Sequence, residues 1–127
     1  MKVAMYVFIN KGLSMSAGKI ASQAIHAGIE AYRISDQKKI KAWYKHKFYP
    51  VYVMEADNAD HLYDIKEYLT ARQIKCEMII DEPMTELSRH TPTALGVELI
   101  DKDQNGAIFE MFKLYKEVIT INLKYER

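Results

Sequence analysis

This sequence has little of what marks several common protein classes. It contains one cysteine, three prolines and five glycines among its 127 residues. The single cysteine excludes an internal disulfide and a multi-cysteine zinc site, and it is typical of a protein from the reducing cytoplasm. No apolar run approaches the roughly 20 residues that a membrane-spanning helix needs. The apolar run over residues 3–9 is short and lacks a following cleavage site, so we interpret it as a strand rather than a secretory signal.

The remaining composition is ordinary for a globular chain, with 49% hydrophobic residues, 28% charged residues and a net charge of +1. This small net charge conceals an asymmetry. Residues 1–50 carry nine Lys or Arg and two acids, whereas residues 51–127 carry nine Lys or Arg and fifteen acids. A basic half suggests a face that binds a polyanion such as nucleic acid. The alternative is that the opposite charges mix when the chain folds, and the sequence leaves both open.

The hydrophobic pattern predicts alternating strands and helices. We expect strands over residues 3–9, 50–55, 75–81, 93–100 and 119–125, helices over 17–34, from Asp36 to near Lys47, after Asp57 or Asn58, and over 109–117, and a turn at 103–106. This order predicts an α/β fold in three layers, with a mixed four- to five-stranded sheet flanked by helices on both faces. We expect one domain over residues 1–127, in which 118–127 form an extra edge strand or a dimer contact.

The first long helix is expected to begin at a cap supplied by Ser14 or Ser16. Its side chains divide into two sets. The apolar set, expected to face the core, is Ile20, Ala24, Ala27 and Ala31, widened by Ala21, Ile25, Gly28 and Tyr32. A second set recurs at spacings of four, three and four and is expected on another face: Lys19, Gln23, His26 and Glu30.

The loop before this helix is the first candidate site. The unpaired N–H groups and the dipole of a helix N-terminus attract an anion, and Lys19 adds a positive charge. A nucleotide-hydrolysing phosphate loop is excluded, because Gly12 and Gly18 enclose five residues instead of four and Ile20 follows the lysine. The alternative is a solvated lysine in the first helical turn.

The second candidate lies around Asp81, which ends an expected strand. Ligands of open α/β sheets gather at the carboxyl ends of the strands. A carboxylate close to the hydroxyls of Thr85 and Thr93 could orient or deprotonate a water molecule. The alternative is that these residue types serve only turns and caps, as they often do.

The third candidate is a basic segment interleaved with aromatic residues. Its lysines are Lys38, Lys39, Lys41, Lys45 and Lys47. Such a mixture suits contacts to phosphates and to exposed bases, although a solvated helix whose Trp43 and Tyr44 pack inward would have the same pattern. The four histidines show no metal-ligand spacing, and Cys76 lies within an expected strand. We therefore expect no metal and no thiol nucleophile.

A family resemblance connects these signals. The segment containing Leu13, Met15, Gly18, Lys19, Ala21, Gln23, His26 and Ala27 resembles the L-x-M-x-x-G-K-x-A-A-Q-x-x-H-A signature of archaeal/eukaryotic-type (type 2) peptidyl-tRNA hydrolases. The residues Asp81, Thr85 and Thr93 have the spacing of that family's D-A-G-x-T motif and the threonine that follows it. The resemblance covers roughly residues 3–116.

The resemblance implies a cytoplasmic, metal-free esterase without a cofactor, often dimeric, which hydrolyses the ester between a peptide and the terminal ribose of tRNA. It assigns Lys19, Asp81, Thr85 and Thr93 to the active site, and Gly18, Gln23 and His26 to substrate binding. With tRNA as the partner, the lysines of the segment 38–47 would receive its stem.

The sequence departs from the family pattern in three respects. Asn10 and Gly12 occupy the places of a usual Arg and Asp, Pro83 replaces a glycine, and residues 118–127 extend past the family's usual end. The lost charge pair leaves a second function open, in which the same fold binds RNA or another anion with weakened or lost chemistry.

Overall fold

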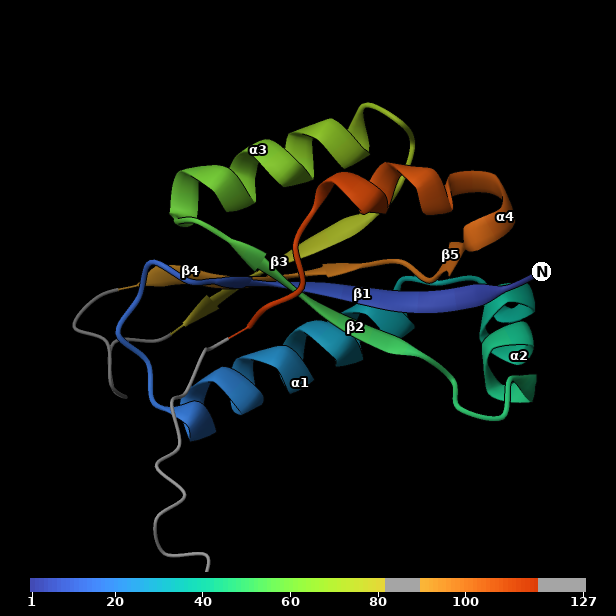
Figure 1. Ribbon diagram of the computed structural model, residues 1–127, viewed down its shortest axis with the longest axis horizontal. Coiled ribbons are helices and arrows are strands. Elements are labelled where there is room, and N and C mark those ends of the chain that lie inside the picture. The colour runs from blue at the N-terminus through green and yellow to red at the C-terminus, as the bar shows by residue number, and fades with distance from the viewer. Residues whose placement is uncertain (82–89, 117–127) are drawn as a thin grey trace, which may run out of the picture.

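The computed structural model describes residues 1–81 and 90–116. At its centre lies a mixed sheet with the order β2-β1-β4-β3 (Figure 1). Its strands are β1 (Val3–Asn10), β2 (Val51–Ala56), β3 (Cys76–Asp81), β4 (Thr91–Val97) and β5 (Ile100–Asp101), which pairs with the beginning of β1. β1 is parallel to β2 and antiparallel to β4, and all eight of its residues are buried. The strand expected over residues 3–9 is confirmed, and it lies in the interior of the sheet.

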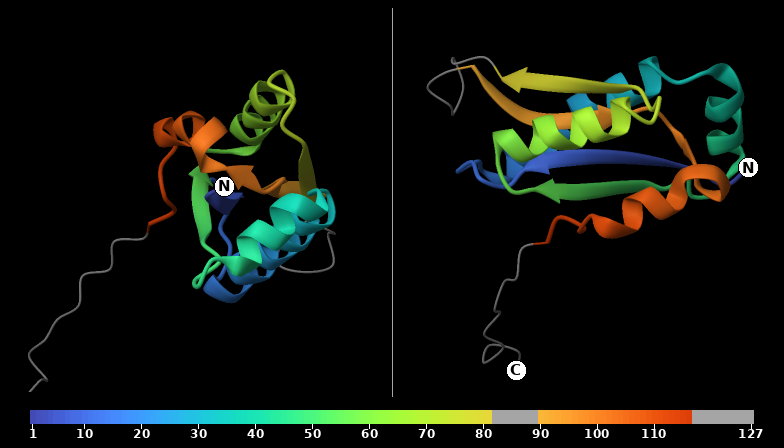
Figure 2. Two further views of the ribbon diagram at one scale, coloured as in Figure 1. Left: turned by 90° about the vertical axis from the view of Figure 1, so that its right-hand side faces the viewer. Right: turned by 90° about the horizontal axis from the view of Figure 1, so that it is seen from above.

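Helices cover both faces of this sheet (Figure 2). On one face lie α1 (Ala17–Arg33) and α2 (Gln37–Lys45). On the other lie α3 (Ala59–Thr70), the short α4 (Lys102–Asn105) and the 3-10 helix η1 (Gly106–Met111). The predicted three-layer α/β architecture is therefore confirmed.

The two faces have different cores. The side that carries α1 and α2 is mainly aliphatic, with Trp43 as its large aromatic side chain. The side that carries α3 is rich in aromatic rings, and Tyr6 stacks on Phe109 with 4.1 Å between ring centroids. The apolar face of α3 lies in this core, where three side chains are buried: Leu62, Ile65 and Leu69.

Local capping sets where the helices begin. Side chains of Ser16, Asp36 and Asn58 accept backbone N–H groups in the first turns of α1, α2 and α3. These polar side chains satisfy donors that have no partner within a helix. Of the alternatives left by the sequence, the caps are therefore Ser16 and Asn58.

Gly96 fixes the distance between α1 and the sheet. A Cβ atom built at this position would lie only 2.2 Å from the carbonyl oxygen of Ala27. Because glycine has no side chain, the helix backbone can rest directly on β4. This close approach, at Ala27 and Ala31, seats α1 directly on β4.

Three predictions near the C-terminus are wrong. The strand expected over 93–100 is two strands, β4 and β5, and the expected turn at 103–106 is helical. Of the helix expected over 109–117, only residues 109–111 are helical among those described, because η1 ends at Met111 and Leu114 then bridges to Met54 on the outer edge of β2. An edge strand offers unpaired N–H and C=O groups that can pair with a passing segment. The strand expected over 119–125 and the proposed edge strand 118–127 lie outside the described residues.

Candidate active site

Lys19 and Asp81 form a buried ion pair where α1 begins. The Lys19 Nζ lies 2.6 Å from the Asp81 Oδ1, and the two side chains are only 9% and 7% exposed. Asp81 is the last residue of β3, and Lys19 is the third residue of α1. The cap from Ser16 to the Lys19 backbone N–H, 3.1 Å long, fixes this first turn. The structure thus joins two residues that the sequence placed in separate candidate sites.

A second polar pair lies deeper between α1 and the sheet. The fully buried Thr93 hydroxyl donates to the side-chain oxygen of Gln23, and the carbonyl of Ile79 lies 3.4 Å from the same hydroxyl. Gln23 is 3% exposed. A buried amide is tolerated when it has a hydrogen-bond partner, and here Thr93 supplies one.

A β-bulge aims the Thr93 side chain at α1. In the pairing of β3 with β4, Ile79 lies opposite Ala94 and Ile80 opposite Pro92, so Thr93 is an extra residue. Such a bulge re-aims side chains and is frequent beside active sites. The side-chain amide of Asn10 donates to the Pro92 carbonyl at 2.9 Å, which holds the bulge against β1.

Asn10 and Gly12 have structural reasons to replace the family's charged pair. Asn10 is 2% exposed, and its side-chain oxygen accepts the Gly12 N–H at 2.9 Å. A Cβ at position 12 would lie 2.7 Å from the Asp57 carbonyl oxygen, so an aspartate does not fit this backbone. Sequence reasoning treated Asn10 as a lost charge and missed its role in holding the bulge.

The predicted division of α1 into two faces is partly wrong. Gln23 lies on the buried stripe with Ala27 and Ala31, whereas His26 is exposed. Three residues expected to widen the apolar stripe are exposed instead: Ala21, Ile25 and Tyr32. The hydrogen bond with Thr93 explains why Gln23 is buried. A hydropathy pattern contains no information about a polar partner elsewhere in the chain. Gly18 is exposed in the first turn, and Thr85 lies outside the described residues.

The lysines of segment 38–47 do not lie beside the Lys19–Asp81 pair. α2 packs at the end of the sheet where β1 begins, and α1 starts at the opposite end (Figure 1). Lys39 is 3.3 Å from the Glu98 Oε1, whereas the other four lysines are exposed. Trp43 packs inward and donates its indole N–H to the Pro50 carbonyl, but Tyr44 is 58% exposed.

Charges of the two halves of the sequence do mix in part. Three lysines from the basic half pair with acids from the acidic half: Lys11 with Glu55, Lys19 with Asp81, and Lys39 with Glu98. The basic half is therefore not one continuous basic face.

The described residues give no indication of thiol or metal chemistry. Burial raises the pKa of the Cys76 thiol to about 12, so this side chain stays protonated at neutral pH and is a poor nucleophile. Within residues 1–81 and 90–116, no three His, Cys, Asp or Glu side chains are grouped as metal ligands would be. The helices of the same part of the chain are all too short or too polar to cross a membrane.

Comparison with known proteins agrees with the family resemblance of the sequence. The family model described as "Peptidyl-tRNA hydrolase PTH2" matches residues 3–115. A "Peptidyl-tRNA hydrolase" of Pyrobaculum aerophilum is 34% identical over 91% of this chain and 100% of its own length. One of Thermococcus onnurineus is 32% identical over 74% of this chain and 86% of its own length. The mouse "Peptidyl-tRNA hydrolase 2, mitochondrial" is 27% identical over 77% of this chain and 58% of its own length.

Proposed function

Because this chain belongs to the peptidyl-tRNA hydrolase PTH2 family, we propose that it hydrolyses the ester between a peptide and the terminal ribose of tRNA. The observation that carries the proposal is the buried Lys19–Asp81 pair at the N-terminus of α1, beside the bulge that presents Thr93. A carboxylate, an ammonium group and a helix N-terminus in one place are the groups that ester hydrolysis needs.

The proposed reaction assigns one task to each group. The Asp81 carboxylate takes a proton from a water molecule as the water oxygen attacks the ester carbonyl carbon. The Lys19 ammonium and the first-turn N–H groups of α1 stabilise the negative oxygen of the tetrahedral intermediate. When the intermediate collapses, the bond to the ribose oxygen breaks and that oxygen takes up the proton held by Asp81. The peptide carboxylic acid formed in this step then releases its remaining proton to solvent. The products are the peptide carboxylate and tRNA with a free terminal hydroxyl.

The remaining site residues have supporting tasks in this proposal. Thr93 is held by Gln23 and shapes the wall of the site, while Thr85 is assigned to the active site by the family motif alone. Gly18 and His26, both exposed on α1, would contact substrate. Since α2 is remote from the ion pair, the exposed lysines on it and directly after it would contact tRNA only far from the ester: Lys38, Lys41, Lys45 and Lys47. Lys39, which pairs with Glu98, would contribute least.

The proposal also covers three finer properties: hydrolysis without a metal, a cytoplasmic location and a homodimer. An apolar surface of α1 and α2 supports the dimer, because Ile25, Ile29 and Tyr44 are each more than half exposed. They line a hollow of about 360 Å³ together with Tyr32 and Trp43. Contiguous exposed apolar side chains are typical of an interface.

Turnover of purified N-acetylaminoacyl-tRNA in the presence of a chelator tests the proposal. We expect hydrolysis by the wild-type protein that survives chelation and is lost in Asp81→Asn. Loss of turnover with the chelator would contradict the metal-free reaction. A complete absence of turnover, with tRNA still bound in a salt-dependent way, would favour the alternative of an RNA-binding module.

A further inference from the structure

Three lysines that are distant in sequence meet at the outer edge of β2. Lys11 follows β1, whereas Lys113 and Lys116 follow η1. They meet because the segment after η1 pairs with β2: the Glu55 N–H donates to the Lys113 carbonyl, and the Tyr115 N–H donates to the Val53 carbonyl, both at 2.9 Å. We call Lys11, Lys113 and Lys116 the β2-edge lysines.

These lysines surround a hollow of about 390 Å³, whose other lining residues are Glu55 and Leu114. Glu55 is the one carboxylate of that lining, and it pairs with Lys11 at 3.1 Å. The Lys11 side chain is 49% exposed, and Lys113 and Lys116 are exposed as well. Three ammonium groups around one carboxylate leave a local excess of positive charge open to solvent. This arrangement attracts a ligand with several negative charges.

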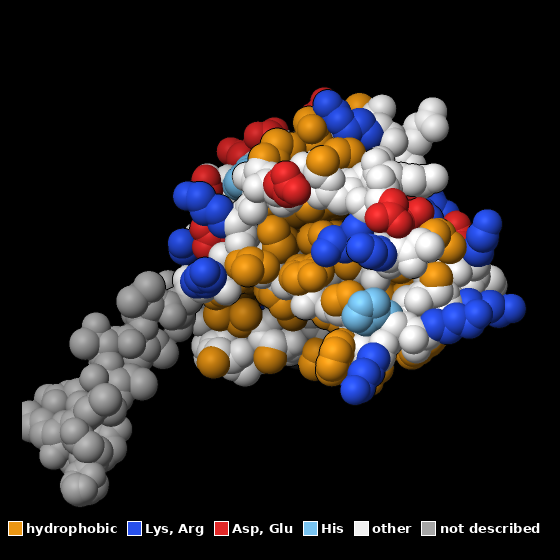
Figure 3. Space-filling view, turned by 45° about the vertical axis from the view of Figure 1, so that its right-hand side comes forward, with side chains coloured by type: hydrophobic (Ala, Val, Ile, Leu, Met, Phe, Trp, Pro, Cys, Tyr) orange, Lys and Arg blue, Asp and Glu red, His pale blue; other side chains and the backbone are white. Residues whose placement is uncertain are grey.

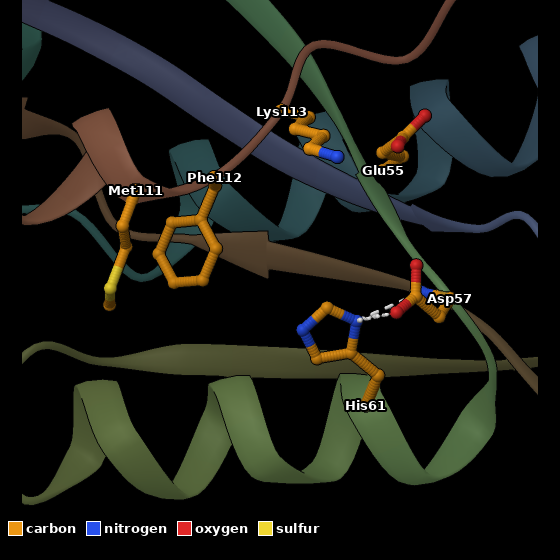
Figure 4. Close-up of a pocket in the computed structure, with 6 residues that line it drawn as sticks. All are labelled: Glu55, Asp57, His61, Met111, Phe112 and Lys113. Atoms are coloured by element: carbon orange, nitrogen blue, oxygen red, sulfur yellow. Dashed lines mark hydrogen bonds and ion pairs between the residues drawn. The ribbon is translucent and has the colours of Figure 1, made fainter.

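A second hollow of about 280 Å³ adjoins the first, since Glu55 and Lys113 line both. The close-up shows the Lys113 amine directed toward Glu55, with the Phe112 ring and the His61 imidazole farther along the hollow (Figure 4). The Nδ1 of His61 accepts the Asp57 N–H at 2.9 Å, which fixes the orientation of the ring. Lys113 is the one lysine of this second lining, which also holds the carboxylates of Glu55 and Asp57, so the excess of positive charge belongs to the first hollow. The rings of Phe112 and His61 beside Lys113 are of the kind on which an unpaired base stacks.

The β2-edge lysines lie at the same end of the sheet as the ion pair. β1, β2 and β3 all run in one direction, and Lys11, Glu55 and Asp81 stand at or near their carboxyl ends. The sheet order places β2 three strands from β3, a span of about 14 Å at 4.8 Å per strand. A few nucleotides at the 3′ end of one strand are enough to cover this span.

We infer that the β2-edge lysines bind backbone phosphates near the reacting 3′ end of tRNA, an assignment that rests on the proposed function. The space-filling view shows Lys and Arg side chains in two groups on one face, separated by hydrophobic side chains, and Asp and Glu side chains lie among the group at its left edge (Figure 3). Lys38, Lys41 and Lys45 are exposed on α2, at the opposite end of the sheet from the ion pair. They provide a matched set of charges on the same protein, remote from the ester.

The test compares two triple variants of equal charge change. One carries Lys11→Gln, Lys113→Gln and Lys116→Gln, and the other carries Lys38→Gln, Lys41→Gln and Lys45→Gln. Steady-state hydrolysis of N-acetylaminoacyl-tRNA is measured from 50 to 300 mM salt, together with hydrolysis of the N-acetylaminoacyl ester of adenosine, which has no phosphate backbone. Thermal unfolding verifies that both variants are folded.

We expect the β2-edge variant to raise KM for the tRNA substrate about tenfold or more and to leave kcat within about twofold. The slope of log(kcat/KM) against log salt should become shallower by about two, because each lost phosphate contact removes 0.7–0.9. Hydrolysis of the adenosine ester should not change. The α2 variant should raise KM less than threefold.

An unchanged KM and salt slope in the β2-edge variant would overturn the inference, as would a larger loss in the α2 variant. A similar loss on the adenosine ester would also overturn it, because it would indicate damage to the active site. If the wild-type protein hydrolyses neither substrate, the proposed function fails, and salt-dependent binding of deacylated tRNA by the same variants then decides the lysine assignment separately.

Discussion

Two ion pairs stand at opposite ends of the β3–β4 pair, and they are alike in chemistry. Each joins a lysine from residues 1–50 to an acid from the second half of the chain. Lys19 lies 2.6 Å from Asp81, and Lys39 lies 3.3 Å from Glu98. Both carboxylates are more than 90% buried. A buried ion pair is therefore not sufficient to identify a catalytic site in this molecule.

Their surroundings differ. Glu98 is held by the backbone on both sides: its Oε2 accepts the Lys75 N–H at 2.7 Å, and its own N–H donates to the Lys75 carbonyl at 2.9 Å. These bonds join the residue before β3 to the residue after β4, a structural task. Asp81 instead faces a helix N-terminus and lies near the bulge at Thr93. The helix end and the bulge, which can act on a substrate, distinguish the Lys19–Asp81 pair.

Replacing the two lysines in turn gives the largest expected contrast. We expect Lys19→Gln to lower kcat for N-acetylaminoacyl-tRNA by about 10²–10³-fold, the loss typical of removing a group that stabilises an oxyanion. Lys39→Gln should change kcat less than twofold. Glutamine can still donate a hydrogen bond to either carboxylate, so both variants should fold, as circular dichroism would verify. Equal kcat values in the two variants would contradict the assignment of a catalytic role to the Lys19–Asp81 pair and a structural role to the Lys39–Glu98 pair.

The next contrast concerns the buried hydroxyl beside the site. Thr93→Val keeps the side-chain shape but leaves the Gln23 amide without this partner, which should cost about 1–3 kcal/mol of unfolding free energy. Thr93→Ser restores the hydroxyl and should recover most of that loss. Urea denaturation measures both variants. If the Thr93→Val variant were as stable as the wild-type protein, the Gln23–Thr93 hydrogen bond could not be what holds α1 over the bulge.

A smaller effect is expected at the structural pair. Glu98→Gln retains an oxygen that can accept the Lys75 N–H but removes the charge from two hydrogen bonds. We expect a loss of about 1 kcal/mol in unfolding free energy and an unchanged kcat. Urea denaturation and a turnover assay on the same preparation measure the two quantities. A fall in kcat beyond threefold would mean that both ends of the sheet serve the reaction.

Sequence reasoning located most of the fold because its signals are local. Ser16, Asp36 and Asn58 each cap a helix through N–H groups three residues away, and Leu62, Ile65 and Leu69 share a face through helical period alone. The resemblance likewise paired Lys19 with Asp81, which the structure brings into contact.

The incorrect predictions depend on partners far along the chain. Gln23 is buried because of Thr93, 70 residues away, and Asn10 holds the carbonyl of Pro92, 82 residues away. Residues 113–115 are extended because β2 offers them an edge. Counting charges along the sequence did not identify Lys113 and Lys116 as part of a basic surface, because both lie in the acidic half of the chain. No local pattern contains these contacts, so periodicity and composition could not have revealed them.

The smallest effect on the enzyme is expected at the start of β3, where Cys76 stands at the opposite end from Asp81. Burial is the main cause that raises the pKa of its thiol to about 12, and the nearby Glu98 and Glu77 carboxylates add to the increase. At pH 8 the thiol is mostly protonated in the unfolded chain and almost wholly protonated in the folded chain, so its ionisation has little effect on stability there. Between pH 9 and 12 the unfolded chain loses this proton first, and stability should therefore fall as pH rises through that window.

Alkylation with iodoacetamide at pH 8 measures the same property. The native thiol should react at least tenfold more slowly than the thiol of the urea-unfolded chain, because far less of it is thiolate. Glu98→Gln removes one of the charges that raise the pKa and should speed the native reaction slightly. Cys76→Ser should leave kcat unchanged. Rapid alkylation of the native protein would show that the start of β3 is more open to solvent than the burial of Cys76 indicates. Loss of turnover in Cys76→Ser would show that this end of β3 contributes to the reaction.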